Sequence, residues 1–330
     1  MDRRQLLLLA AAAGAVAALP ARAATTWRLA SGYRRESFHT VNLLALAADV
    51  AAATNGELRL DVQPNGALAK LNDIRAAVED GRAEAGETIM SSLVAQMPIA
   101  GVDSVPFITA SYADARHMWV HQRPLVERRF AQRGLQVLYA VPWPPQGLHS
   151  TKPIAGVADL KGSRMRSYNP TTARIAALLG AQAVDVPMVE VGQALSEGRI
   201  DTMITSAVTG VENQVWSRIR FYYEINAWFP KNIVFCRAAA LQALPAAQRE
   251  ALVAAAAKAE ARGWAASEAA AASSVDELRR NGVKIERVPH DLNLELKRLG
   301  ERFSLEWLHQ AGGEANEFFI PYFTRPRPPG

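Results

Sequence analysis

The chain has 330 residues, 49% of them hydrophobic, which is enough apolar material for two lobes with separate cores. Its formal net charge is +5 at pH 7 and its basic residues are not clustered, so composition argues against nucleic-acid binding and favours a small anionic ligand. The single cysteine, Cys236, excludes an intramolecular disulfide.

Residues 1–23 have the pattern of an export signal. Arg3 and Arg4 precede an apolar run, residues 6–19, that is too short to span a bilayer, and an Ala-Arg-Ala cleavage site follows it. The arginine pair also resembles a twin-arginine signal, so the general secretory and twin-arginine routes both remain open. No later apolar run has membrane length, so we expect a mature chain that begins near Ala24 and is not embedded in a membrane.

The first half of the mature chain predicts alternating strands and helices. Because this order indicates a parallel sheet with crossover helices, ligands are expected at the carboxyl ends of the strands, where Ser31 and Glu87 would lie. The predicted strands cover residues 27–30, 57–63, 84–89 and 135–141, and the predicted helices cover 40–54, 72–80 and 111–133.

The second half repeats this plan after a proline-rich connection, residues 142–147, where the chain is expected to cross into a second lobe. Segments 221–229 and 232–237 are predicted as strands of the return crossing. The Ala-rich segment 246–280 predicts one helix long enough to lie across both lobes, with a bend at Gly263. Within the second lobe we expect strands at 184–187 and 200–205 and a helix at 189–197.

Residues 159–170 carry the strongest candidate binding site. An Asp-Leu-Lys-Gly turn feeds a short strand whose Arg166 emerges beside Asn169, and Pro170 opens the next helix. A guanidinium presents a fixed fork of donors that matches a carboxylate, and Asn169 with the amides of the helix start adds neutral donors. An arginine at a strand end is also commonly a solvated residue or part of a structural ion pair. The motifs in the surrounding sequence are therefore needed to distinguish a binding role from these two.

Other constellations are weaker. His117 and His121 have the spacing of a metal face, but a solvated helix face explains them better, and we predict no metal site and no cofactor. The sequence has no Gly-x-Ser-x-Gly elbow and no Cys–His pattern, so no catalytic residue is predicted. Trp228 and Phe229 fit a core, yet a cleft position beside Arg166 would let a ring stack on a flat ligand, and we predict that role for them.

Motifs spread over most of the mature chain resemble the periplasmic solute-binding subunits of tripartite ATP-independent periplasmic (TRAP) transporters, the DctP family. The resemblance implies an α/β, two-lobed periplasmic binding protein fold with a hinge and a long helix that spans both lobes. It places residues 24–143 plus 231–270 in lobe 1 and residues 144–230 plus 271–330 in lobe 2. The motifs are Thr-Asn-Gly-Glu-Leu at 54–58, Val-Gln-Pro-Asn-Gly-Ala-Leu at 62–68, Val-Pro-Phe at 105–107, the stretch from 159 to 166, Leu-Gly-Ala at 179–181, and residues 190–201.

The resemblance also implies roles for single residues. In the family the arginine at the position of Arg166 clamps the ligand's carboxylate, an amide at the position of Asn169 assists it, and the first lobe contributes an acid that matches Glu87. Gln146 and Thr205 stand where sialate-binding members carry arginine and asparagine, so a single carboxylate without a large polyhydroxy body is expected. The predicted ligand-binding residues are Arg166, Asn169, Glu87, Gln146, Met188, Thr205, Trp228 and Phe229.

The predicted function is that of a periplasmic binding protein that captures a small organic acid anion between its lobes and delivers it to TRAP membrane subunits. Hydroxy, keto, aromatic or lactam monocarboxylates, such as pyroglutamate, fit one arginine faced by an acid. The lobes would close about hinge segments near 143–146 and 229–232. Two alternatives stay open at this point: a ligand-sensing subunit for a receptor, and an exported enzyme on the same architecture.

Overall fold

The computed structural model describes residues 24–324, so the predicted export signal lies outside the described residues. The first of its two sheets has five strands in the order β2-β1-β3-β10-β4. β1 pairs in parallel with β2 and β3, whereas β10 runs antiparallel between β3 and β4. The strands are β1 (Thr25–Ser31), β2 (Leu58–Gln63), β3 (Ala85–Ile89), β4 (Leu135–Pro142) and β10 (Lys231–Arg237), and the helices of this lobe are α1 (Phe38–Ala53), α2 (Ile74–Glu79), α3 (Tyr112–Ala131) and α7 (Ala238–Ala243), with short 3₁₀ turns η1 (Leu71–Asp73), η2 (Met90–Leu93) and η3 (Pro98–Ser104).

The second sheet has six strands in the order β11-β9-β5-β8-β6-β7. The predicted strand at 221–229 is only three residues long, because the left-handed backbone of Asn226 (φ 46°) and the following Pro230 do not suit a strand. The strands are β5 (Gln146–Ser150), β6 (Arg164–Ser167), β7 (Gln182–Asp185), β8 (Thr202–Ser206), β9 (Phe221–Tyr223) and β11 (Lys284–Glu286), and the short helices are α4 (Pro170–Leu178), α5 (Val191–Ser196), α6 (Ala207–Glu212), η4 (Val157–Leu160), η5 (Met188–Glu190) and η6 (Val215–Ser217).

Two chain crossings between the sheets lie side by side, one from β4 to β5 and one from β9 to β10. Backbone hydrogen bonds join them: Trp143 N–H donates to the carbonyl of Pro230 (2.7 Å), and Gln146 N–H donates to that of Trp228 (3.0 Å). The proline-rich connection is shorter than predicted, because β4 extends to Pro142 and β5 already begins at Gln146. The crossings overlap the segments near 143–146 and 229–232, whose role as hinges stays a prediction.

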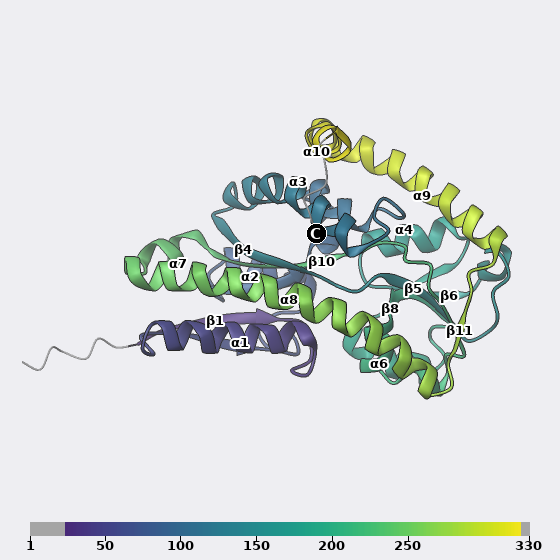
Figure 1. Ribbon diagram of the computed structural model, residues 1–330, viewed down its shortest axis with the longest axis horizontal. Coiled ribbons are helices and arrows are strands. Elements are labelled where there is room, and N and C mark those ends of the chain that lie inside the picture. The colour runs from purple at the N-terminus through teal and green to yellow at the C-terminus, as the bar shows by residue number, and fades with distance from the viewer. Residues whose placement is uncertain (1–23, 325–330) are drawn as a thin grey trace, which may run out of the picture.

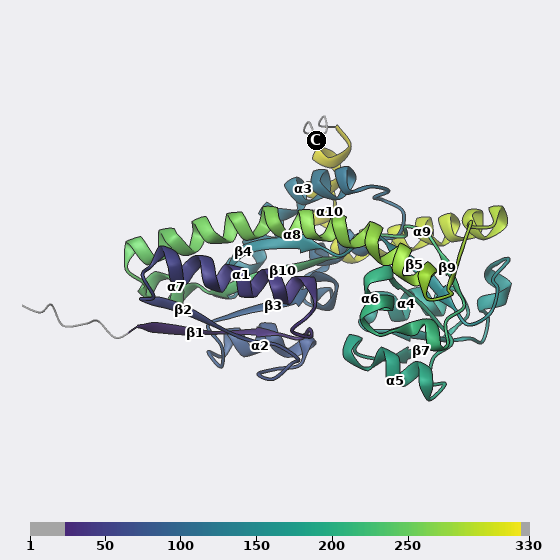
Figure 2. The ribbon, with the colours of Figure 1, turned by 60° about the horizontal axis from the view of Figure 1, so that its bottom comes forward.

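Helix α8 (Ala246–Arg280) runs along both lobes (Figures 1 and 2), packing on α1 and β4 at one end and on α6 and β11 at the other. Its bounds are those predicted, and the helix is continuous through Gly263. A Cβ at Gly263 would lie 2.3 Å from Cγ2 of Val141 and 2.8 Å from Nδ2 of Asn42. The glycine therefore allows a close approach of α8 to β4 and α1.

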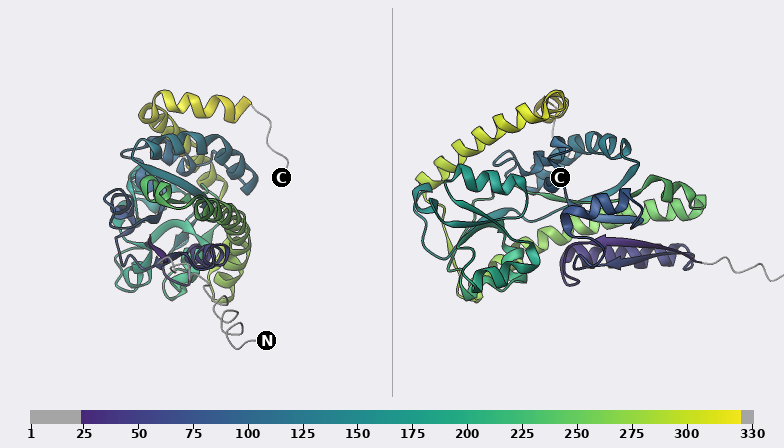
Figure 3. Two further views of the ribbon diagram at one scale, coloured as in Figure 1. Left: turned by 90° about the vertical axis from the view of Figure 1, so that its left-hand side faces the viewer. Right: turned by 180° about the vertical axis from the view of Figure 1, so that it is seen from behind.

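Two C-terminal helices cover one face of the molecule (Figure 3), α9 (His290–Ala311) and α10 (Gly313–Thr324). α9 packs on η3 and η4, one from each lobe, and α10 packs on α3. Ion pairs join Arg128 to Glu317 (2.8 Å) and Arg129 to Glu314 (2.8 Å). Although the predicted boundaries place residues 271–330 with the second lobe, the end of this segment packs on a helix of the first. Among the described residues no helix is both long and apolar enough to cross a membrane.

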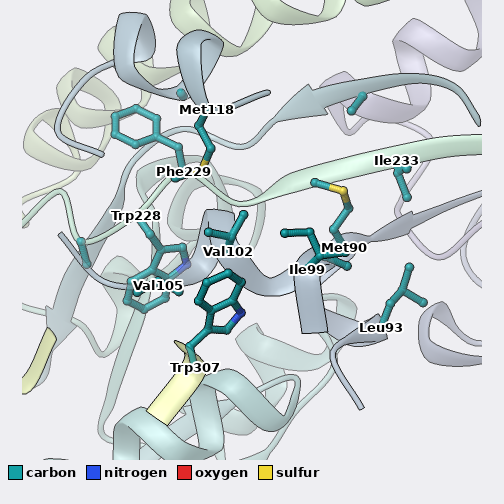
Figure 4. Packing of buried hydrophobic residues seen from close by; sticks show 14 of the residues in the cluster. Met90, Leu93, Ile99, Val102, Val105, Met118, Trp228, Phe229, Ile233 and Trp307 are labelled. Carbon is teal, nitrogen blue, oxygen red and sulfur yellow. The ribbon is translucent and has the colours of Figure 1, made fainter. Parts of the chain in front are cut away.

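The largest apolar core joins the first lobe to the second crossing and to α9, and it extends into the second lobe through residues such as Met165 and Ile204. Figure 4 shows Trp228 beside Val105 and Trp307, and Phe229 beside Met118. Trp228 and Phe229 are only 1% and 2% exposed. The aromatic pair at the end of the second crossing is therefore packed into a continuous apolar core.

We predict that Gly263→Ala destabilises the protein by about 1–3 kcal/mol, because the added methyl group would overpack the contact with Val141 and outweigh the better helix propensity of alanine. Urea unfolding followed by circular dichroism measures the change. Ala257→Gly, at an exposed position of the same helix, is the matched control and should cost about 1 kcal/mol through propensity alone. A Gly263→Ala protein more stable than the wild type would contradict the packing argument.

Candidate functional site

A cavity of about 540 Å³ lies between the two lobes. The first lobe lines it from the segment after β1 and from around η1, and the second lobe lines it from the ends of β6, β7 and β8 and from η5. The two crossings contribute Trp143 and Pro230. Its volume and mixed apolar and polar wall are those of a site for a small molecule.

Arg166 is the buried cation of this cavity. Its Nε donates to the carbonyl of Val186 (2.9 Å), and its guanidinium carbon lies 4.6 Å from the ring centre of Tyr168. Arg166 is 4% exposed, and burial lowers its pKa to about 10, so it remains charged at neutral pH. Across residues 24–324 no carboxylate forms a salt bridge with it. Asp185, which also lines the cavity, raises the pKa of the guanidinium through its charge. A buried charge without a salt bridge is costly, so a bound anion would be stabilising.

The local fold explains where Arg166 points. β6 pairs in parallel with β7 and β8, so its carboxyl end opens toward the first lobe beside the start of α4. Asn169 caps that helix: its Oδ1 accepts from the backbone N–H of Thr172 (2.9 Å), and its Nδ2 donates to Oγ of Ser91 (2.6 Å) in the first lobe. The cap thus also joins the two lobes next to the cavity.

Three aromatic side chains line the cavity around Arg166: Tyr33, Trp143 and Tyr168. The rings of Tyr33 and Trp143 have centres 5.3 Å apart. Burial raises the pKa of Tyr168 to about 12 and that of Tyr33 well above its ordinary value. Both phenols therefore stay neutral, and neither repels an anion bound to Arg166.

Four of the eight predicted ligand-binding residues line the cavity: Arg166, Gln146, Met188 and Thr205. Nε2 of Gln146 donates to the carbonyl of Pro144 (2.8 Å), and Oγ1 of Thr205 donates to Oγ1 of Thr209 (3.1 Å). Met188 lies in η5 and adds apolar surface. One wall of the predicted site is thus assembled around the arginine.

The structure gives the other four residues different surroundings, away from the cavity lining. Glu87 is buried inside the first lobe, where its Oε2 accepts from Oγ of Ser31 (2.9 Å) and its Oε1 lies 3.4 Å from Nδ1 of His39. Asn169 is the helix cap described above, and Trp228 and Phe229 belong to the apolar core.

Sequence reasoning did not select Tyr33, Tyr168 or Lys70, which also line the cavity. Tyr168 follows Arg166 by two residues, so strand alternation could have placed both on one side. Tyr33 follows Ser31, a residue that was expected at the carboxyl end of its strand. Lys70 follows a turn and carries no comparable signal.

The histidine pair of α3 has structural surroundings. Nε2 of His117 donates to the carbonyl of Tyr322 (2.8 Å), which joins α3 to α10. The rings of His117 and His121 are 4.8 Å apart and nearly perpendicular. In the part of the chain that the structure describes, no cluster of three or more His, Cys, Asp or Glu side chains could hold a metal ion.

Comparison with protein families gives a match for residues 33–297 to DctP, described as bacterial extracellular solute-binding protein, family 7. The chain belongs to this family. The family resemblance and the two-lobed α/β fold predicted from sequence are therefore confirmed. A curated solute-binding protein of Albidiferax ferrireducens is 25% identical over 166 residues, 49% of this chain and 48% of that one, so the chain spans about half the length of that relative.

Solved structures of solute-binding proteins resemble most of the chain. DctP7, an extracytoplasmic solute receptor of Bordetella pertussis binding pyroglutamic acid, is 38% identical with a TM-score of 0.90, covering 91% of this chain and 100% of that one. A TRAP solute binding protein from a marine metagenome, specific for pyroglutamate, is 33% identical with a TM-score of 0.89, covering 91% and 99%. A receptor from a Sulfitobacter species with bound galacturonate, at 16% identity and a TM-score of 0.82 with 92% and 100% covered, shares the fold.

His149 lies behind the cavity on β5, fully buried with its ring centre 4.6 Å from that of Tyr222. Burial lowers its pKa to about 3, and the positive charge of Arg166 acts in the same direction. The folded protein thus holds this imidazole neutral, whereas the unfolded chain takes up a proton near pH 6.5. The resulting stabilisation is complete above pH 6.5 and is lost as the pH falls toward 3.

We predict that the wild type loses stability below pH 6.5 relative to His149→Gln, at up to about 1.4 kcal/mol per pH unit, because only the wild type has to keep this histidine unprotonated. Urea unfolding between pH 7.5 and 4.5 measures the difference. His309→Gln, at an exposed position, is the control and should follow the wild type. Parallel pH curves for wild type and His149→Gln would show that the buried imidazole does not contribute.

Proposed function

We propose that this DctP-family protein captures a small organic monocarboxylate in the interlobe cavity, with pyroglutamate as the first candidate. The observation that carries the proposal is Arg166, a buried guanidinium that faces the cavity without a salt bridge among the described residues. A carboxylate would accept hydrogen bonds from the two Nη groups, because Nε already donates to the carbonyl of Val186.

The rest of the cavity suits a compact, partly apolar acid. A micromolar dissociation constant corresponds to about −8 kcal/mol, and one charged hydrogen-bonded contact contributes only about 1.5–3 kcal/mol net. Apolar burial against Tyr33, Trp143 and Met188 has to supply much of the remainder. The solved relatives at 33–38% identity that bind pyroglutamate support a five-membered lactam acid of this kind.

We further propose that ligand binding favours closure of the two lobes. The closed form is also stabilised by Arg34, a residue that does not line the cavity. Arg34, after β1 in the first lobe, donates through Nη1 to the carbonyl of Glu212 (2.7 Å) and through Nη2 to that of Val189 (2.6 Å). Its Nη2 also lies 3.3 Å from Oδ1 of Asn213. All three acceptors belong to the second lobe, so Arg34 can make these bonds only when the lobes are close together.

The wider setting is part of the same proposal. The signal at residues 1–23 would export the chain to the periplasm, where the closed, loaded form would be recognised by TRAP-type membrane subunits. The protein would bind its acid without changing it chemically. The family description and the receptor and solute-binding roles printed for its solved relatives support this reading.

We predict that Arg166→Ala weakens pyroglutamate binding by at least about 100-fold, equivalent to about 3 kcal/mol, because the carboxylate loses its charged partner. Arg166→Lys should also lose much of the affinity, since it keeps the charge but not the fork. Isothermal titration calorimetry measures both changes. Arg164→Ala, on the same strand but exposed and paired with Asp201, is the matched control and should bind like the wild type.

A thermal-shift screen of organic acids tests the ligand class itself, because a tight ligand raises apparent stability by mass action. We expect stabilisation by pyroglutamate or related lactam and hydroxy acids and no response from their amides. A wild-type protein that no carboxylate stabilises, or an Arg166→Ala protein that binds as tightly as the wild type, would contradict the proposal.

We predict that Arg34→Ala weakens the binding of every acid by a similar factor, about 10-fold, because it removes hydrogen bonds of the closed form and no contact with the ligand. Calorimetry measures the affinities for several acids, and the ratios between these affinities should equal those of the wild type. Arg35→Ala changes the exposed neighbour and serves as control. A loss confined to one acid would indicate that Arg34 contacts the ligand instead.

A further inference from the structure

Asn232 lies behind the aromatic wall of the cavity, which is formed by Tyr33 and Trp143. It is 0% exposed and sits in β10, paired with Ile89 of β3 on one side and with Val141 of β4 on the other. It is not one of the residues that line the cavity. Its backbone is therefore fixed by two neighbouring strands, and its side chain reaches the residues that do line the cavity.

One oxygen atom of Asn232 holds two of the wall's side chains. Its Oδ1 accepts from the hydroxyl of Tyr33 (3.0 Å) and from Nε1 of Trp143 (2.9 Å). An indole N–H can only donate, so the amide oxygen must face it, and both lone pairs of that oxygen are then used. The hydroxyl hydrogen of Tyr33 is consequently committed to Asn232.

This arrangement fixes the direction in which the hydroxyl of Tyr33 forms hydrogen bonds. A phenol whose hydrogen already points at Asn232 can only accept a further hydrogen bond. Tyr33 and Arg166 line the same cavity. A ligand whose carboxylate binds Arg166 would share the cavity with this acceptor.

The rings themselves are held by packing as well as by the shared oxygen. His39 lies 4.4 Å from Trp143 and 5.9 Å from Tyr33 between ring centres, and Phe38 lies 5.4 Å from Trp143. Without the oxygen of Asn232, two buried donors would lose their acceptor, which costs more than the bonds contribute. The side chains would then turn to find other partners.

We propose that Asn232 is a positioning residue that makes the cavity selective for acids carrying a hydrogen-bond donor next to the carboxylate. It orients Tyr33 as an acceptor and fixes Trp143 beside it, although it does not touch the ligand. The inference rests on the proposed function and deepens it. The N–H of a lactam acid or the O–H of a 2-hydroxy acid is the group that Tyr33 would select.

The experiment compares two probes of the same shape, pyroglutamate and its lactone analogue, in which a ring oxygen replaces the N–H. Calorimetry on the wild type should give at least a 10-fold preference for the lactam. Asn232→Leu, similar in size but without the acceptor, should bind the lactam about 10-fold more weakly and lose most of the preference. Tyr33→Phe should also lose the preference, and the double variant should lose little more than Asn232→Leu alone, because both act through one hydrogen bond.

Asn42→Leu is the matched control. Asn42 is also buried, and its amide is bonded at both ends, to Ala259 and Arg262, but it joins α1 to α8 and does not line the cavity. This variant should lose stability while its affinity and its lactam preference stay unchanged. It separates a general effect of removing a buried amide from a specific effect on the wall.

The outcomes are distinct. A folded Asn232→Leu protein with wild-type affinity and preference would overturn the inference, as would a wild type that binds both probes equally, and in either case the proposed function would stand. If Asn232→Leu does not fold, Tyr33→Phe decides alone: an unchanged preference overturns the inference and a lost preference supports it. A wild type that binds no organic acid overturns the proposed function and this inference together.

Discussion

The cavity depends on one charge that the fold buries without neutralising. Arg166 is held from behind by the carbonyl of Val186 and from the side by the ring of Tyr168, and neither contact removes its positive charge. The desolvation of this guanidinium is reflected in its lowered pKa. Because no described carboxylate forms a salt bridge with it, although Asp185 acts on it through its charge, an anion that enters between the lobes gains more than it would from a surface arginine.

Four residues selected from the sequence line this cavity, and their role in binding stays a prediction. Arg166 was predicted from a short motif that sets a strand, a turn and a helix start in fixed order, and such local order survives folding. Gln146, Met188 and Thr205 also line the cavity, at the positions that the family resemblance indicated. Long, uniform periodicity was equally reliable, as the bounds of α8 show.

The rest depended on contacts between distant segments, which one sequence does not encode in a readable form. Glu87 ends up inside the first lobe because Ser31 and His39 satisfy its carboxylate there. Trp228 and Phe229 pack into the core against Val105, Met118 and Trp307, which come from three other segments of the chain. Asn232, far in sequence from Tyr33 and Trp143, accepts from both, and ring packing also joins the two side chains.

The glycine contact in α8 limits how the two halves can move. At Gly263 the helix backbone lies against Val141 with no room for a methyl group, so α8 cannot slide along β4 without colliding with it. The first half of the helix therefore travels with the first sheet as one body. If the lobes open as proposed, the motion would combine flexing of the helix beyond that point with rotation at the two paired crossings. The long helix would then keep the same register on the first sheet in the open and closed forms.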